Sequence, residues 1–134
     1  MMGLKVGLNS RFFLTVGGAA LLLLGILGFI GVIGPTPDKS LFGSNWWFDS
    51  GENLAHTVLG IAGLASLYVL PAKWQTYLVG ALGVLGVGVG LYSGVVATAL
   101  LGSSLENPAD TLLHLVVGGW ALATFYTEWK ASAK

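Results

Sequence analysis

The chain contains no cysteine, which excludes disulfide bonds, thiolate nucleophiles and cysteine-bound metal or iron–sulfur sites. Charge is also scarce, because only 9% of the 134 residues are Asp, Glu, Lys or Arg, whereas about a quarter are charged in a soluble domain. The formal net charge is zero and no basic run occurs, so nucleic acid is not an expected partner. We also find no phosphate-binding loop, no HExxH motif and no nucleophile accompanied by a base, and therefore expect no enzyme.

Hydrophobic residues, in contrast, make up 54% of the chain. A helix needs roughly 20 apolar residues to cross a bilayer, and four stretches approach that length, at 12–34, 53–70, 75–101 and 110–127. We therefore expect an all-α membrane protein in which residues 1–134 form a single domain of four transmembrane helices. The surface of this domain is expected to contact the lipid bilayer.

The basic residues are distributed unevenly around these four spans. Five of the six fall on one side of the membrane: Lys5, Arg11, Lys73, Lys130 and Lys134. Only Lys39 falls on the other side. By the positive-inside rule both termini are then cytoplasmic, and the loops 35–52 and 102–109 face outward.

An internal repeat surrounds the only two histidines. Aligning them places an acid four residues before each ring and a glycine four residues after it: Glu52, His56 and Gly60 in the first copy, and Asp110, His114 and Gly118 in the second. The repeat predicts two tandem helical hairpins in the same orientation, with both histidines at one level near the outer surface.

The spacing also predicts contacts for these histidines. Residues four apart share a helix face, so we expect Glu52 to reach His56 and Asp110 to reach His114. In one interpretation the histidines are structural, and each ring bonds its acid, a loop carbonyl or the other histidine near the headgroup boundary.

In a second interpretation His56 and His114 are axial ligands of a tetrapyrrole. One haem would lie between the second and fourth helices, or separate chlorophyll-type pigments would take one histidine each, because bundles hold cofactors between facing helices. The small residues that follow, including Gly60 and Gly118, would leave room for a flat ring, and Glu52 and Asp110 would orient the imidazoles.

In a third interpretation His56, His114, Glu52 and Asp110 form a divalent metal site on the outer face, a ligand set that zinc accepts. The sequence offers no further catalytic group, so this interpretation includes no hydrolase chemistry.

Two further features suggest contact surfaces. Gly86, Gly90 and Gly94 recur every four residues and form a groove on one helix face, which favours packing inside the bundle over self-association or docking to another subunit. The cluster Trp46, Trp47 and Phe48 is typical of an anchor at the membrane interface. The alternatives for the cluster are a docking surface, or a lid over the outer ends of the second and fourth helices.

Together these motifs resemble a family of small bacterial membrane proteins known as domain-of-unknown-function family 4383. The matching residues are Asn53, His56 and Gly60 in an Asn-x-x-His-x-x-x-Gly motif, and Asn107, Ala109, Asp110, Leu113 and His114 in an Asn-x-Ala-Asp-x-x-Leu-His motif. Thr111 departs from the pattern, in which asparagine is frequent. The resemblance implies a four-helix protein of a bacterial cytoplasmic membrane and no established activity.

From these observations we expect a non-enzymatic, multi-pass membrane protein. Its most direct role is that of an accessory subunit that packs against other membrane subunits or against itself, and tetrapyrrole binding through His56 and His114 is the alternative.

Overall fold

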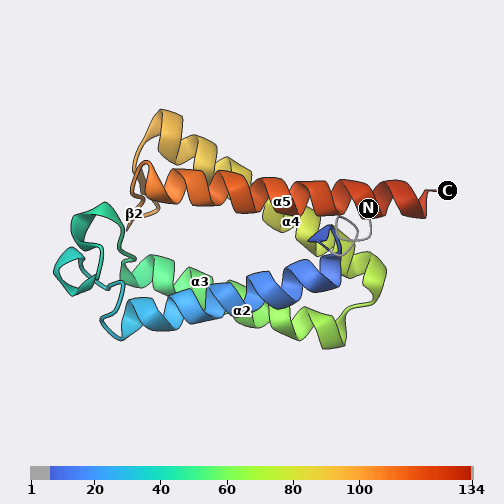
Figure 1. Ribbon diagram of the computed structural model, residues 1–134, viewed down its shortest axis with the longest axis horizontal. Helices are drawn as coiled ribbons and strands as arrows, with labels where there is room; N and C mark the ends of the chain where they lie inside the picture. The colour runs from blue at the N-terminus through green and yellow to red at the C-terminus, as the bar shows by residue number, and fades with distance from the viewer. Residues whose placement is uncertain (1–6, 134) are drawn as a thin grey trace.

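Residues 7–133, which the computed structural model describes, form four long α-helices joined by loops with short helical and strand elements (Figure 1). The long helices are α2 (Ser10–Phe29), α3 (Ser50–Val69), α4 (Ala72–Leu91) and α5 (Ala109–Ser132). The loop between α2 and α3 contains the 3-10 turns η1 (Pro37–Lys39) and η2 (Gly43–Asn45). A π-helix, η3 (Tyr92–Val96), extends α4, and the strands β1 (Ala99–Leu100) and β2 (Ser103–Ser104) pair before α5.

Each of the four expected spans corresponds to one helix, but two of them end earlier than predicted. The span 12–34 contains α2 only up to Phe29, and Gly31 then adopts a φ of +86°, which turns the chain in a conformation that glycine tolerates. The span 75–101 is helical only through Val96, because Ala99 and Leu100 pair with β2 instead.

The four helices pack as two hairpins, α2 with α3 and α4 with α5 (Figure 1). The hairpins touch each other closely near the end where the chain termini lie. A small apolar core forms there from Phe13 and Leu14 of α2, Val79 of α4 and Ala121 of α5. Trp120 packs edge-on against Phe13, with ring centroids 4.6 Å apart.

Polar contacts strengthen the same end. The Glu128 carboxylate accepts hydrogen bonds from the Ser10 backbone N–H at 2.7 Å, from the Ser10 hydroxyl at 2.7 Å and from the Thr76 hydroxyl at 2.6 Å. Because these groups belong to α2, α4 and α5, one carboxylate joins three helices across the two hairpins.

Equivalent glycines bring the two helices of each hairpin into backbone contact. A Cβ atom on Gly60 of α3 would lie 2.5 Å from the Leu22 backbone nitrogen of α2. A Cβ atom on Gly118 of α5 would lie 2.6 Å from the Val87 backbone nitrogen of α4. Such distances leave no room for a side chain, so the two halves of the sequence repeat build the same contact.

The π-helix distinguishes the second hairpin from the first. The Asn53 side chain packs on Gly28 in the first hairpin, whereas Thr111, at the equivalent position of α5, packs on Gly94. A π-helical turn adds a residue to a helix, and such turns are frequent at functional sites. Here the turn also brings the Ser93 hydroxyl to 2.7 Å from the Thr111 hydroxyl in a buried hydrogen bond.

The glycine groove of α4 is filled by α5 of the same chain. A Cβ atom on Gly86 would lie 3.1 Å from the Gly118 Cα, one on Gly90 would lie 2.9 Å from Leu115, and one on Gly94 would lie 3.0 Å from Thr111. Packing inside the bundle, the favoured interpretation, is therefore confirmed. The use of these glycines as an interface with another subunit stays a prediction, for which Gly94, the one exposed glycine of the three, offers surface.

Within the described residues, two helices are long and apolar enough to cross a membrane by length and composition: α2, and α4 continued by η3 from Ala72 to Val96. The basic residues Arg11, Lys73 and Lys130 lie in or next to the helix ends nearest the termini. Lys5 and Lys134, which were expected on the same side, lie outside the described residues.

The glycine contact predicts a large difference between neighbouring substitutions. Gly118→Ala should lower the free energy of unfolding by about 1–3 kcal/mol, because the added methyl group collides with the α4 backbone. Gly119→Ala is the matched control, since its Cβ meets nothing within 4 Å. Thermal unfolding of the detergent-solubilised protein measures both, and equal midpoints for the two variants would contradict the proposed packing.

Candidate functional site

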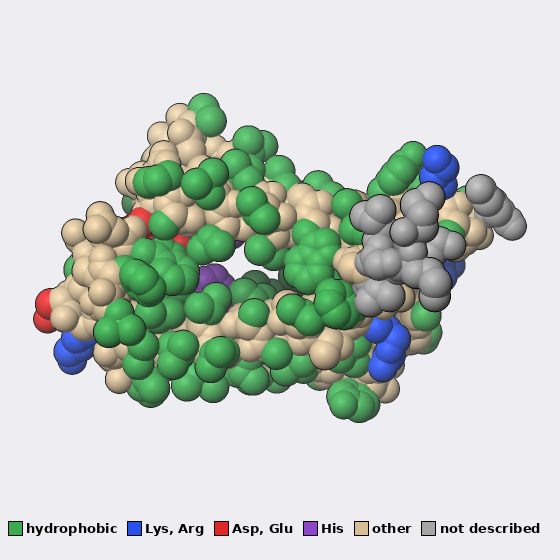
Figure 2. Space-filling view, in the orientation of Figure 1, with side chains coloured by type: hydrophobic (Ala, Val, Ile, Leu, Met, Phe, Trp, Pro, Cys, Tyr) green, Lys and Arg blue, Asp and Glu red, His purple; other side chains and the backbone are tan. Residues whose placement is uncertain are grey.

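An apolar cleft lies between the two hairpins. Its volume is about 280 Å³, and side chains from all four long helices line it, among them Leu21, Leu59, Leu85 and Val117. Figure 2 shows the hollow between the hairpins, with histidine in its wall. The cleft exists because the hairpins are joined at their two ends and remain apart between these ends.

His56 and His114 both face this cleft. Each belongs to the second helix of its hairpin and follows the start of that helix by about one turn, and both α3 and α5 begin at the loop end of the molecule (Figure 1). Both histidines therefore lie at the same end of the bundle, and their place near the outer surface of a membrane stays a prediction.

The His114 ring has a defined orientation. Its Nδ1 atom lies 2.7 Å from the backbone carbonyl oxygen of Asp110, one helical turn earlier. Because a carbonyl oxygen only accepts hydrogen bonds, Nδ1 carries the proton and Nε2 keeps a free lone pair. His114 is thus prepared to bind a metal ion through Nε2.

The His56 ring is held by packing instead of hydrogen bonding. Its buried Nδ1 atom has no hydrogen-bond partner among the described residues. The ring contacts Phe48 edge-to-face, with centroids 5.1 Å apart. His56 therefore presents an unpaired polar group in apolar surroundings.

Within residues 7–133, neither acid side chain makes a direct hydrogen bond to its histidine. The Asp110 carboxylate accepts hydrogen bonds from the Trp46 indole at 3.0 Å and from the Glu106 backbone N–H at 2.9 Å. The Glu52 carboxylate has no hydrogen-bond partner within residues 7–133. Both acids lie in the first turn of their helices, and at Asp110 the donors of the neighbouring loops take the place of the histidine of the next turn.

The aromatic cluster closes the cleft at the loop end. Trp46 donates its indole N–H to Asp110 of α5, and its ring packs against Phe48 with centroids 5.1 Å apart. Phe48 is only 2% exposed and lines the cleft next to His56. The structure therefore agrees with a lid over the starts of α3 and α5. Phe48 is too buried to form part of an outward docking surface or a membrane anchor. Trp47 is half-buried.

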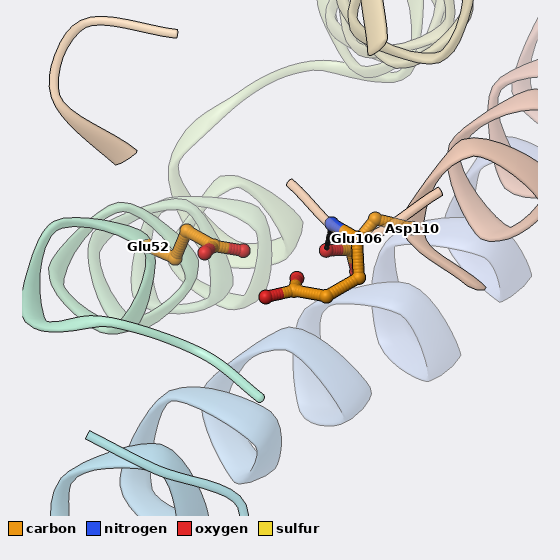
Figure 3. Close-up of side chains that lie close together, drawn as sticks. All are labelled: Glu52, Glu106 and Asp110. Atoms are coloured by element: carbon orange, nitrogen blue, oxygen red, sulfur yellow. Dashed lines mark hydrogen bonds between the residues drawn. The ribbon is translucent and has the colours of Figure 1, made fainter. Parts of the chain in front are cut away.

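Beneath this lid, Glu52, Glu106 and Asp110 bring three carboxyl groups together (Figure 3). Each offers an oxygen within 4.8 Å of the other two. Burial, followed by a hydrogen bond with Asp110 and its negative charge, raises the pKa of Glu106 to about 8. Glu52 and Asp110 are buried, with exposures of 6% and 1%.

Sequence reasoning missed Glu106, although its spacing offered a signal. Glu106 stands four residues before Asp110, and the Asp110 backbone N–H donates to the Glu106 carbonyl at 2.7 Å, as in a helical turn. The metal site predicted from His56, His114, Glu52 and Asp110 is not assembled in that form. Within the described residues Glu106 joins the two acids, and neither histidine belongs to the group.

Asp49 organises the loops around this cluster. Its carboxylate caps α3 by accepting from the Glu52 backbone N–H at 2.9 Å, and it accepts from the Ser104 backbone N–H of β2 at 2.6 Å. One side chain thereby fixes the start of α3 against the loop that precedes α5, and this contact brings Glu52 towards Glu106.

No protein-family model matches the chain, and neither a curated protein nor a solved structure matches it. The resemblance to domain-of-unknown-function family 4383 therefore rests on the two histidine motifs themselves, and the candidate site rests on the geometry of the cleft and of the acids beside it.

The lid generates a prediction about stability. Trp46→Phe keeps the aromatic packing but removes the indole donor to the buried Asp110 carboxylate, and should lower the free energy of unfolding by about 1–3 kcal/mol. Trp47→Phe changes the neighbouring ring in the same way without touching that bond. Thermal unfolding of both variants checks the expectation, which fails if Trp47→Phe is the more damaging change.

Proposed function

We propose that the chain is a multi-pass protein of a bacterial cytoplasmic membrane, with four transmembrane helices and both termini in the cytoplasm. Two of these helices, α3 and α5, are less apolar overall than the other two. Their exposed faces nevertheless carry large apolar side chains, which supports their placement in the membrane. Leu54 and Ile61 of α3 are 59% and 54% exposed, and Val116 of α5 is 68% exposed.

The polar residues of the same helices are turned the other way. Asn53, Ser66 and Thr124 are buried against neighbouring helices. Large apolar side chains outside and polar groups inside are the reverse of a soluble bundle, in which extended apolar surface is rare. A lipid environment accounts for this distribution.

Within this framework, we propose that the cleft binds a tetrapyrrole, haem or a chlorophyll-type pigment, with His114 as an axial ligand. The single observation that carries the proposal is the hydrogen bond from His114 Nδ1 to the Asp110 carbonyl. A ligating histidine typically donates its other ring N–H to such an acceptor, which orients the ring and raises its basicity.

The wall opposite His114 supports the same ligand. His56 lines the cleft from α3, which places its ring as a second ligand or as a hydrogen-bond partner. One acid, Asp110, also lies in the cleft wall, and its carboxylate accepts hydrogen bonds from the Trp46 indole and the Glu106 backbone N–H beneath the lid. The remaining walls of the cleft are almost entirely apolar.

The cleft is small for a tetrapyrrole, so it would enclose only part of the ring. Its volume of about 280 Å³ is near the lower limit of ligand pockets, which range over roughly 300–1,000 Å³. Gly17, Gly63 and Gly86 line parts of the walls and leave flat surfaces against which a ring can lie. A macrocycle seated here would extend its edge past the helices into the surrounding lipid.

The second candidate function is a non-enzymatic accessory subunit that packs against other membrane subunits. The exposed apolar surface of all four helices favours it, with Leu23, Val58, Val84 and Val116 as examples. Because the α4 glycines already contact α5, such a partner would use these outer faces. We further propose that the protein belongs to the family that its histidine motifs resemble.

Purification in mild detergent separates the two functions. If the cleft holds a tetrapyrrole, the protein should be coloured, and His114→Ala should remove or shift the visible band while the helical content stays unchanged. His56→Ala tests the second ligand in the same way. A colourless protein that does not acquire a band when titrated with haem or chlorophyll would contradict the tetrapyrrole, and a stoichiometric protein partner would then favour the accessory subunit.

The membrane arrangement has a separate test. A phosphatase that is active only outside the cytoplasm should be inactive when fused after the last residue and active when inserted near Lys39, because the basic residues favour a cytoplasmic C-terminus. The opposite pattern would reverse the proposed topology.

A further inference from the structure

Of the three acids in the cluster, Glu52 has the fewest hydrogen bonds to its carboxylate. It is 6% exposed, and neither carboxylate oxygen has a hydrogen-bond partner within residues 7–133. Figure 3 shows the carboxylate extending from α3 towards Glu106 and Asp110. A buried carboxyl group without a donor is costly unless a proton or a cation neutralises it.

The neighbours of Glu52 increase this cost. The charged groups that act on it are Asp110, Asp49 and Glu106, and all of them are acids. Four carboxyl groups at one end of the molecule repel each other when ionised, because no opposite charge among these neighbours offsets them. The local structure therefore favours a positively charged ligand at this position.

The oxygens that remain free are suitably placed for such a ligand. Both oxygens of Glu52 and the Oε2 atom of Glu106 are buried and unpaired. Each Asp110 oxygen accepts one hydrogen bond and retains a second lone pair. Asp49, in contrast, uses both oxygens to hold the backbone of α3 and β2, so we assign it to the scaffold.

We propose that Glu52, Glu106 and Asp110 bind one divalent, oxygen-preferring cation of about the size of Ca²⁺ beneath the aromatic lid. The three ligand oxygens lie within 4.8 Å of one another, so one ion can reach all of them, because two oxygens bound to the same Ca²⁺ are at most about 5 Å apart when each bond is roughly 2.4 Å. Carboxylates without histidine or cysteine suit Ca²⁺, Mg²⁺ or Mn²⁺ better than zinc.

The ion would connect three segments that come together at this end of the molecule. Glu52 lies in the first turn of α3, Asp110 in the first turn of α5, and Glu106 in the loop before α5. A bound cation would hold the two hairpins together at the closed end of the cleft, opposite the Glu128 contacts. This proposal does not depend on tetrapyrrole binding.

The test uses the full chain, purified in mild detergent and stripped of metal with a chelator. Titration with Ca²⁺ should show saturable binding of one ion per chain by calorimetry and a rise in the midpoint of thermal unfolding. Glu52→Gln should weaken binding at least about tenfold, because affinity at such sites follows the number of charged ligands. Asp38→Asn, which removes an exposed acid from the loop between α2 and α3, is the control and should bind as the unmodified protein does.

Two outcomes would overturn the site. One is the absence of saturable binding with Ca²⁺, Mg²⁺ and Mn²⁺, which would mean that the cluster is neutralised by protons alone. The other is unchanged Ca²⁺ affinity in Glu52→Gln. Should that variant fail to fold, Glu106→Gln removes a half-exposed ligand of the same cluster, and unchanged affinity there has the same meaning.

Discussion

Backbone contact between the two helices of each hairpin is the constraint on which the rest of the structure depends. Gly60 and Gly118 meet the backbones of α2 and α4 so closely that no side chain fits between them. Small residues therefore occupy the contact between the two helices of each hairpin, and the larger apolar side chains point away from that contact. Some of them face outward, and others line the space between the hairpins. The cleft and the apolar outer surface follow from the same packing.

The two hairpins are then held together differently at their two ends. Near the termini, the apolar core around Phe13 and Val79 is reinforced by Glu128, whose carboxylate is satisfied by three donors. At the loop end, the contacts run through Trp46, Asp110 and the acids beside them. The Glu128 carboxylate is paired with its donors, whereas Glu52 and Glu106 at the loop end carry oxygens without a partner within residues 7–133. Of these two ends, the loop end therefore has the chemistry of a binding site.

The histidines and the acidic cluster meet at Asp110. The rings of His56 and His114 face the cleft, which Asp110 also lines, while the Asp110 carboxylate gathers with Glu52 and Glu106 beneath the lid. The link that remains is the backbone of Asp110, whose carbonyl orients His114 while its side chain belongs to the acidic cluster.

Hydropathy and spacing alone determined the four helices, the order of the two hairpins and the common level of His56 and His114, because these properties depend on local periodicity and on the repeat. The tertiary structure decided which groups each side chain meets. The Asp110 carboxylate, for example, bonds the Trp46 indole from a distant loop and the Glu106 backbone N–H instead of the histidine one turn away. Likewise, the partner of the α4 glycines and the membership of Glu106 in the cluster depend on how the hairpins pack. No spacing along one helix encodes such packing.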